Sequence, residues 1–307
     1  MPLLSKFNVR SSTFKVLPLL LQACSPSAPT SPPQIALVLK SLTTEPTATL
    51  VQKAIAHQAE HPTDYTLIIK GIDNTTDLAA QVHHIDQLAT TGIQALIISP
   101  ADPSALIPAL TRAAAQGIRI LTIDTPLTAS DLPSAFIGPD NQTAAHQIGL
   151  ALAKKRQPGD PVAIIHGPPT DLTSQQRRTG LETALRETQL QIVAIETANN
   201  NLEQANALTQ SLISQHPNLK AILCTSDTMA LGAASAIQAA RKTSQILVTG
   251  FDHIPAIQPL IANGQVTATA DPHTTQLAVT AIEVALKSLQ TQTPPNPQTT
   301  PVDIITN

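Results

Sequence analysis

The sequence predicts an α/β fold in which parallel strands alternate with helices. Four apolar runs of strand length carry this prediction, and each ends in a polar or acidic residue: residues 95–99, 118–124, 221–227 and 246–252. The runs lack polar alternation, which is typical of strands buried on both faces. A helical pattern follows each run, and such alternation produces a parallel sheet. Because ligands bind outside the carboxyl ends of parallel strands, we expect these polar residues to converge on one crevice.

The other elements follow in chain order from local signals. Asn141 can cap a helix, Gly92 and Gly117 stand between a helix and a strand, and prolines keep residues 292–301 non-helical. We expect further strands at residues 35–39, 65–70, 135–137, 162–166, 191–196, 266–270 and 302–305. We expect helices near residues 47–60, 75–91, 103–116, 141–156, 173–188, 202–215, 227–241, 254–263 and 273–290. One sheet of about ten strands would be unusually wide, so two lobes are expected, divided at Gly138-Pro139-Asp140.

Composition excludes several functions. The chain has no Trp, one Tyr and four Phe, too few aromatics for base-stacking platforms, and its 21 acidic residues outnumber its 18 basic ones. No basic stripe is present, so we expect no nucleic-acid partner. No glycine-rich phosphate loop occurs either, and we expect no cofactor and no resident metal. The buried strand position of Cys224 favours a small hydrophobe over a reactive thiol.

The N-terminus has the order of an export signal. Residues 1–15 carry three basic and no acidic residues, and the apolar stretch 16–21 that follows is too short to span a bilayer. Leu21-Gln22-Ala23-Cys24 resembles the bacterial lipobox. We expect a signal peptide at residues 1–23 and a lipidated Cys24 that opens a Pro-rich tether over residues 24–33. The alternative is an unstructured tail with a chance cysteine.

Several motifs together resemble the type I periplasmic solute-binding proteins, the ribose- and galactose-binding class that shares its core with LacI-type effector domains. The motifs are Ser226-Asp-Thr-Met-Ala-Leu-Gly-Ala233, Gly250-Phe-Asp252, Ile97-Ile-Ser-Pro-Ala-Asp102, Ile123-Asp124, Asp140-Asn141 and Arg177-Arg-Thr-Gly180. The resemblance covers most of residues 34–306. It implies two Rossmann-like lobes with parallel sheets, joined by a three-crossing hinge and closing on a ligand.

The resemblance also implies an assignment of segments and partners. The N-terminal lobe takes residues 34–138 and 272–295, and the C-terminal lobe takes residues 139–271 and 296–307. We expect a monomeric substrate-binding lipoprotein of an ABC importer at the cell envelope, with a small polar solute, a sugar or sugar-like molecule, in the cleft. A membrane permease is the expected protein partner. The alternative is a ligand sensor that reports to a membrane receptor or kinase. Such a sensor would have the same two-lobed fold, so the sequence does not distinguish it from a binding protein of an importer.

The same resemblance places ligand-binding residues at strand ends. Asp124 and Asp252 match the family's ligand aspartates, and Ser99 and Ser226 match positions that are often Asn. Arg177 contacts the ligand or forms a structural ion pair, and Asp140 and Asp227 bind ligand or cap helices. Thr44 completes the candidates. It lies in the loop 43–48, which lacks the aromatic pair that stacks on sugar rings in relatives, and this departure puts a pyranose in doubt.

One enzymatic alternative arises from His57-Gln-Ala-Glu-His61, which matches the His-x-x-Glu-His pattern of inverted zinc proteases. His57 and His61 would share a helix face and could bind one zinc ion in a hydrolase. Pro62 ends the helix at once, which disfavours this alternative. We therefore expect no enzymatic activity.

Overall fold

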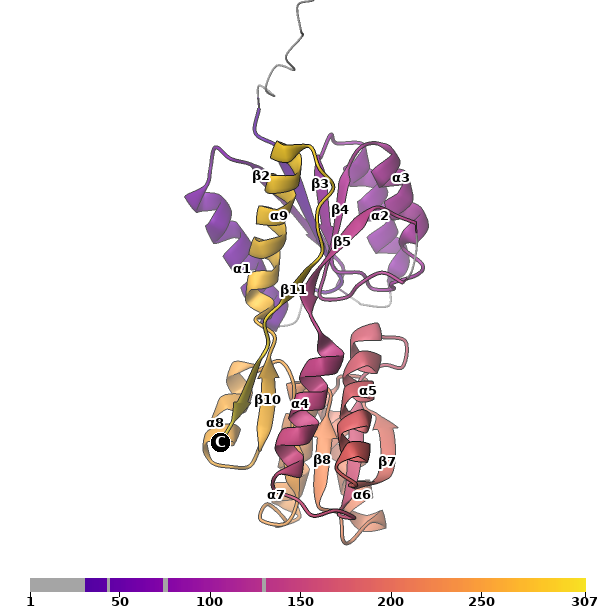
Figure 1. Cartoon of the computed structure of the whole chain (residues 1–307), viewed down its shortest axis with the longest axis vertical. Coiled ribbons are helices and arrows are strands. Elements are labelled where there is room, and N and C mark those ends of the chain that lie inside the picture. The colour runs from indigo at the N-terminus through magenta and orange to yellow at the C-terminus, as the bar shows by residue number, and fades with distance from the viewer. Residues whose placement is uncertain (1–30, 43–44, 74–76, 129–130) are drawn as a thin grey trace, which may run out of the picture. The chain divides into compact units, whose positions relative to one another are not determined.

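The computed structural model describes residues 31–42, 45–73, 77–128 and 131–307, apart from the side chains of residues 45 and 46. Residues Pro32–Asn307 form one compact unit. Within them the chain builds two lobes, each a six-stranded sheet with helices on both faces (Figure 1). The predicted α/β architecture is confirmed. No helix in the described part of the chain is long and apolar enough to cross a membrane.

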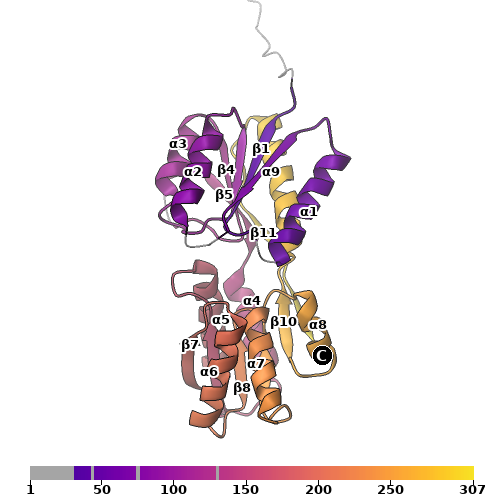
Figure 2. The same ribbon diagram turned by 180° about the vertical axis from the view of Figure 1, so that it is seen from behind.

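The first lobe is a parallel sheet in the order β11-β5-β4-β3-β1-β2. Its strands are β1 (Gln34–Leu39), β2 (Thr66–Gly71), β3 (Ala95–Ile98), β4 (Arg119–Ile123), β5 (Ser134–Pro139) and β11 (Gln298–Thr300). Helices α1 (Glu45–Glu60) and α9 (Leu277–Thr291) cover one face, where Ile35 and Leu37 are buried. Helices α2 (Leu78–Ala89) and α3 (Ile107–Ala115) cover the other, over Ala36 and Val38 (Figure 2). This double coverage explains the uninterrupted apolar strands.

The second lobe repeats the design in the order β12-β10-β9-β8-β6-β7, with only β12 antiparallel. Its strands are β6 (Pro161–His166), β7 (Gln191–Thr197), β8 (Ala221–Cys224), β9 (Leu247–Thr249), β10 (Ala268–Asp271) and β12 (Asp303–Thr306). Helices α4 (Asn141–Ala153) and α5 (Leu172–Glu187) cover one face, and α6 (Leu202–Gln215) and α7 (Asp227–Ala239) cover the other. The predicted 254–263 helix is a 3₁₀ turn, Pro255–Ile257, followed by α8 (Gln258–Ala262).

The chain crosses between the sheets three times, after β5, β10 and β11. A proline stands at each crossing: Pro139 is the last residue of β5, and Pro272 and Pro301 directly follow β10 and β11. Proline has a fixed φ and no N–H, so it ends strand pairing and restricts the crossing backbone. The third crossing corrects the expected segment 296–307, because Gln298–Thr300 pairs with β5 of the first sheet. Only Asp303–Thr306, beyond Pro301, joins the second sheet.

Candidate functional site

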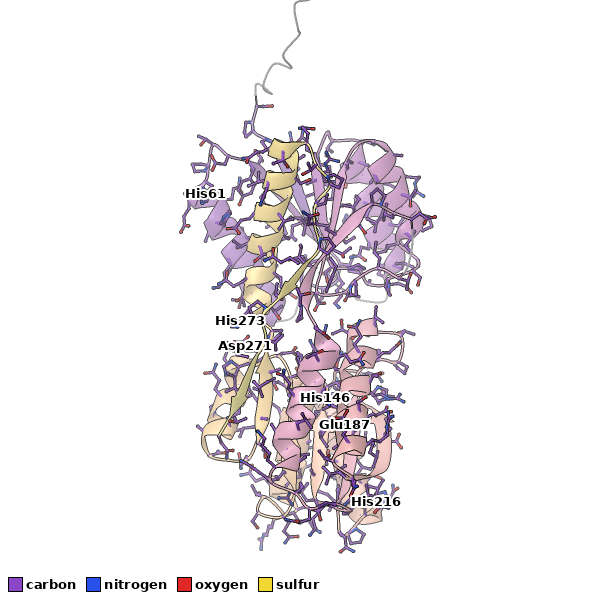
Figure 3. The ribbon with its side chains drawn as sticks, viewed as in Figure 1. His61, His146, Glu187, His216, Asp271 and His273 are labelled. Carbon is purple, nitrogen blue, oxygen red and sulfur yellow. The ribbon has the colours of Figure 1, made fainter. Side chains whose placement is uncertain are left out.

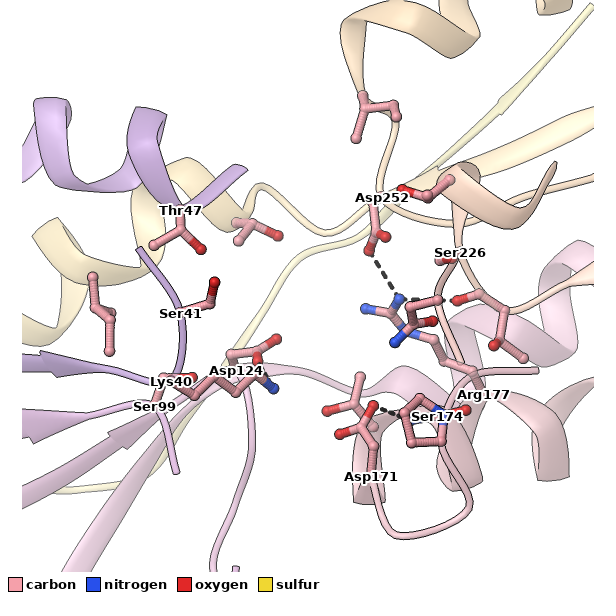
Figure 4. Close-up of a pocket in the computed structure, with 18 of the residues that line it drawn as sticks. Lys40, Ser41, Thr47, Ser99, Asp124, Asp171, Ser174, Arg177, Ser226 and Asp252 are labelled. Carbon is pink, nitrogen blue, oxygen red and sulfur yellow. Dashed lines mark hydrogen bonds and ion pairs between the residues drawn. The ribbon is translucent and has the colours of Figure 1, made fainter. Parts of the chain in front are cut away.

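A cavity of about 530 Å³ lies between the carboxyl ends of the two sheets, within the range typical of small-molecule sites (Figure 4). Residues of both lobes line it, and most of them are polar. They are Leu39, Lys40, Ser41, Thr47, Leu50, Ser99, Ile123, Asp124, Pro168, Asp171, Thr173, Ser174, Arg177, Asn199, Asn200, Thr225, Ser226, Thr228, Asp252, Ile254 and Thr274. None of these side chains is aromatic. The wall therefore offers hydrogen bonds rather than a stacking surface.

Asp124 stands at the first lobe's edge of this cavity, directly after β4. Its φ of 64° is left-handed, and Thr125 N donates to Ile123 O at 2.6 Å across it. This tight three-residue turn is uncommon and strained, and such backbone occurs preferentially at binding sites. Lys40 Nζ lies 2.6 Å from Asp124 Oδ2. Burial raises the pKa of Asp124, but the charge and hydrogen bond of Lys40 outweigh it and keep the pKa below its usual range, so the carboxylate is ionised.

Asp252 occupies the matching place in the second lobe, with a φ of 110°. Its Oδ1 accepts a hydrogen bond of 2.8 Å from Arg177 Nη1. Arg177 is itself fixed: Nε donates to Asn141 Oδ1 at 2.9 Å, Nη1 donates to Thr225 O at 3.1 Å, and Cζ lies 3.7 Å from the centre of the Phe251 ring. Burial raises the pKa of Asp252, and Arg177 offsets this only in part. Arg177 thus both forms a structural ion pair and lines the cavity.

The two predicted serines are present in the cavity wall. Ser99 follows β3, where the buried Gln81 fixes the loop by donating from Nε2 to Ser99 O at 2.9 Å and accepting from Ala101 N at 2.8 Å. Ser226 caps α7, and its Oγ accepts from Met229 N at 3.5 Å. The structure thus brings together five of the predicted residues, Ser99, Asp124, Arg177, Ser226 and Asp252.

Asp227 does not line the cavity, although it follows Ser226. It is fully buried, and it accepts from Thr269 Oγ1 at 2.7 Å and from Ile254 N at 3.0 Å. Its carboxylate packs against Gly250, where a Cβ would lie only 2.0 Å from Oδ1. Burial, and next the charge of Asp252, raise the pKa of Asp227 to about 7. Asp227 is therefore a positioning residue for the loop that carries Asp252.

Asp140 is also outside the cavity wall. It is the exposed N-cap of α4, and it accepts from Thr143 N at 2.9 Å and from Thr143 Oγ1 at 2.7 Å. The capping interpretation thus describes Asp140. Thr44 and Cys24 lie outside the described residues.

Four lining residues with charged or amide side chains were not predicted: Lys40, Asp171, Asn199 and Asn200. Lys40 directly follows β1, and Asp171 caps α5 by accepting from Ser174 N at 3.2 Å. Asn199 and Asn200 follow β7 with left-handed φ values of 51° and 56°. Their positions after strands are the signal that could have identified Lys40 and the two asparagines.

Neither histidine of the α1 pair, His57 and His61, lines this cavity, and His61 lies at the outer side of the first lobe (Figure 3). His57 Nδ1 is 2.7 Å from Tyr65 Oη, and His61 Nδ1 is 3.1 Å from Asp64 Oδ2. Among the described residues, no group of three or more His, Cys, Asp or Glu could hold a metal ion. The zinc hydrolase alternative gains no support from this arrangement.

Comparison with known proteins gives concordant matches. A family model described as a periplasmic binding protein domain matches residues 35–293. The D-ribose/D-allose-binding protein of Pseudomonas aeruginosa is 39% identical over 93% of this chain and 95% of that protein. An ABC transporter solute-binding protein of Burkholderia multivorans, with an unknown ligand represented as α-D-erythrofuranose, superposes with a TM-score of 0.83 at 35% identity, covering 90% of this chain and 100% of the other.

A second solved structure is the periplasmic solute-binding protein of Actinobacillus succinogenes with bound D-allose. It has a TM-score of 0.84 at 29% identity and covers 89% of this chain and 97% of the other. Both structural matches extend over the two lobes described above.

Proposed function

Because the chain belongs to the periplasmic binding protein family, we propose that it is the sugar-binding protein of an ABC importer, with ribose, allose or a related uncharged sugar as its ligand. The sugar binds in the cleft between the lobes, and contacts to both lobes stabilise the closed form. A permease recognises that form and receives the sugar. The protein acts as a monomer, and its role is binding without chemical conversion of the ligand.

One observation carries this proposal: Asp124 and Asp252 follow strands β4 and β9 of different lobes and line the same cavity (Figure 4). A carboxylate accepts hydrogen bonds from two neighbouring hydroxyl groups, and Lys40 and Arg177 hold the two acids in place through ion pairs. Neighbouring hydroxyls that each donate and accept are the chemistry of sugars. A ligand that bridges both acids must also bring the lobes together.

The types of side chain in the cavity wall also indicate which sugars can bind. Among the described residues, no aromatic side chain lines the cavity, so these residues offer no stacking partner to the apolar face of a pyranose ring. Small hydroxyl-bearing side chains, among them Thr47, Thr173 and Thr228, take that place. This favours small sugars, furanoses included, that are held through their hydroxyl groups.

Isothermal titration calorimetry with D-ribose, D-allose and D-glucose tests the proposal. The wild-type protein is expected to bind ribose or allose, and Asp124→Ala and Asp252→Ala are each expected to lose binding. Asp86→Ala is the matched control, because Asp86 pairs with Arg112 on the surface and does not line the cavity. Undiminished affinity in both cavity variants contradicts the proposed site.

The proposal includes export and attachment to a membrane. The family is periplasmic, and the basic-then-apolar order of residues 1–23 followed by Cys24 fits a signal peptide and a lipidated cysteine. Labelling with a radioactive fatty acid is expected to mark the wild-type protein and not Cys24→Ser. Cys224→Ser is the control, since Cys224 is buried in β8 and burial raises its pKa. Label that persists in Cys24→Ser contradicts lipidation at this residue.

A further inference from the structure

Asp171 lines the cavity from the second lobe but forms no ion pair with any described residue. Its Oδ2 accepts from Ser174 N at 3.2 Å as the N-cap of α5. That bond uses one acceptor site of a group that has about four. The rest of the carboxylate is available to a donor in the cleft.

Among the described residues, the other charged side chains of the cavity are paired inside their own lobes. Lys40 pairs with Asp124 at 2.6 Å in the first lobe, and Arg177 pairs with Asp252 at 2.8 Å in the second. Asp171 is the third carboxylate against two cations, so these five groups carry a net charge of −1 when all are ionised. This excess negative charge belongs to the second lobe alone.

Lys40 on the opposite wall has one N–H donor that is not used inside its own lobe. Its ammonium has three N–H donors, of which one goes to Asp124 Oδ2 and one to Thr125 Oγ1 at 3.0 Å. One donor thus remains on the first-lobe wall, across the cleft from Asp171 (Figure 4). Burial lowers the pKa of Lys40, but attraction first to Asp124 and then to Asp171 outweighs burial and raises it. The charge of Asp171 is therefore already felt at Lys40.

We propose that Asp171 and Lys40 form an ion pair across the cleft when the lobes close, and that Asp171 thereby restricts the site to uncharged ligands. The inference rests on the proposed function and adds a specificity-determining residue to it. With its third donor bound to Asp171, Lys40 has none left for a phosphate or carboxylate on the ligand. The net negative charge of the cavity opposes the same anions.

A double-mutant cycle on Asp171→Asn and Lys40→Gln tests the ion pair. Asn keeps the N-cap, because its Oδ1 can still accept from Ser174 N. We expect Asp171→Asn to weaken D-ribose binding about tenfold in calorimetry, as loss of a close interfacial charge pair does. The same change made in Lys40→Gln is expected to have little further effect. Additive losses overturn the ion pair.

Asp171→Glu and Asp77→Asn are the matched controls. Glu restores the charge and is expected to recover most of the lost affinity. Asp77 is the N-cap of α2, accepts from Ala80 N at 3.0 Å and lies outside the cavity, so Asp77→Asn is expected to bind D-ribose as the wild type does. If Asp171→Asn folds poorly by circular dichroism, Asp171→Ser provides a second uncharged N-cap for the same cycle.

D-ribose 5-phosphate tests the specificity. The wild-type protein is expected to exclude it, and Asp171→Asn is expected to bind it measurably. Exclusion that is equally strict in Asp171→Asn overturns the specificity role of Asp171. A wild-type protein that binds none of the neutral sugars instead contradicts the proposed function, so the two failures are distinguishable.

Discussion

Each lobe presents one ion-paired aspartate to the cleft, and the two pairs differ in the cation rather than in the acid. The side chains of Asp124 and Asp252 are almost equally exposed, at 24% and 26%. Lys40 beside Asp124 is 26% exposed, whereas Arg177 beside Asp252 is 8% exposed and is fixed by Asn141, Thr225 and Phe251. Arginine presents a rigid fork and lysine a point charge on a flexible stem. The second lobe is thus preorganised, and the first lobe is adaptable.

The difference also appears in the acids' proton affinities. Lys40 outweighs burial and lowers the pKa of Asp124, while Arg177 does not fully offset burial and the pKa of Asp252 is raised. The guanidinium of Arg177 also donates hydrogen bonds to Asn141 and to Thr225 O. Its donors are therefore divided between these structural contacts and Asp252. The fold therefore holds the donor beside Asp252 more rigidly than the donor beside Asp124.

Arg177→Met tests this comparison with the largest expected effects, because it is expected to lower stability and to abolish sugar binding. It leaves Asp252 and Asn141 without their donor, and breaking a buried ion pair costs about 3 kcal/mol of unfolding free energy. We expect that loss in urea denaturation, together with loss of sugar binding. The neighbouring Arg178 pairs with Glu182 on the helix surface, so Arg178→Met is expected to change stability by no more than about 0.5 kcal/mol. Equal stabilities of the two variants would contradict a preorganised second lobe.

Asp227→Asn tests the support of the second lobe through the pH dependence of stability, with an expected effect on the order of a few kcal/mol. The pKa of Asp227 is raised to about 7, so the folded protein holds a proton that the unfolded chain releases near pH 4. The contribution of Asp227 to stability therefore falls as pH rises from about 4 to about 7. A flipped Asn can still bond Thr269 and Ile254.

Urea unfolding of the wild type and of Asp227→Asn between pH 4 and pH 8 measures this contribution. The difference between the two proteins isolates Asp227 from Asp124 and Asp140, whose lowered pKa values act in the opposite direction at acidic pH. A difference that stays constant over this range would mean that Asp227 is ionised throughout.

Lys40→Met is expected to have a smaller effect on stability, below about 1 kcal/mol, because partly exposed ion pairs contribute little. Sugar affinity is expected to fall about tenfold, since the cation that holds Asp124 and pairs with Asp171 across the closed cleft is lost. The pKa of Asp124, followed by NMR titration, is expected to rise because its main lowering influence is removed. Destabilisation as large as that of Arg177→Met would remove the asymmetry between the lobes.

The fold and part of the cavity wall were predictable because both follow from strand ends. Buried parallel strands give uninterrupted apolar runs, and the residues after them, Asp124 and Asp252, must lie at the edge where ligands bind. Strand β11 was not predictable in this way, since it has three residues between prolines and none of them is hydrophobic.

The remaining site residues depend on three-dimensional proximity. Asp140, Asp171 and Asp227 all stand at helix starts, and the sequence pattern is alike for the three. The first is an exposed cap, the second a cap that lines the cleft, and the third a buried support. Only the packing of each helix against its own sheet decides which of these roles its first residue has.

Asp140, at the crossing between the lobes, allows the test with the smallest expected effect on sugar binding. Asp140→Ala removes the acceptor of the Thr143 N–H and is expected to cost about 1 kcal/mol of unfolding free energy, the usual value of an N-cap. Asp140→Asn keeps an acceptor and is expected to lose much less. Sugar affinity by calorimetry is expected to be unchanged in both variants, because Asp140 does not line the cavity. An affinity loss in Asp140→Asn with unchanged stability would place Asp140 in contact with the ligand, and the first crossing would then belong to the binding surface.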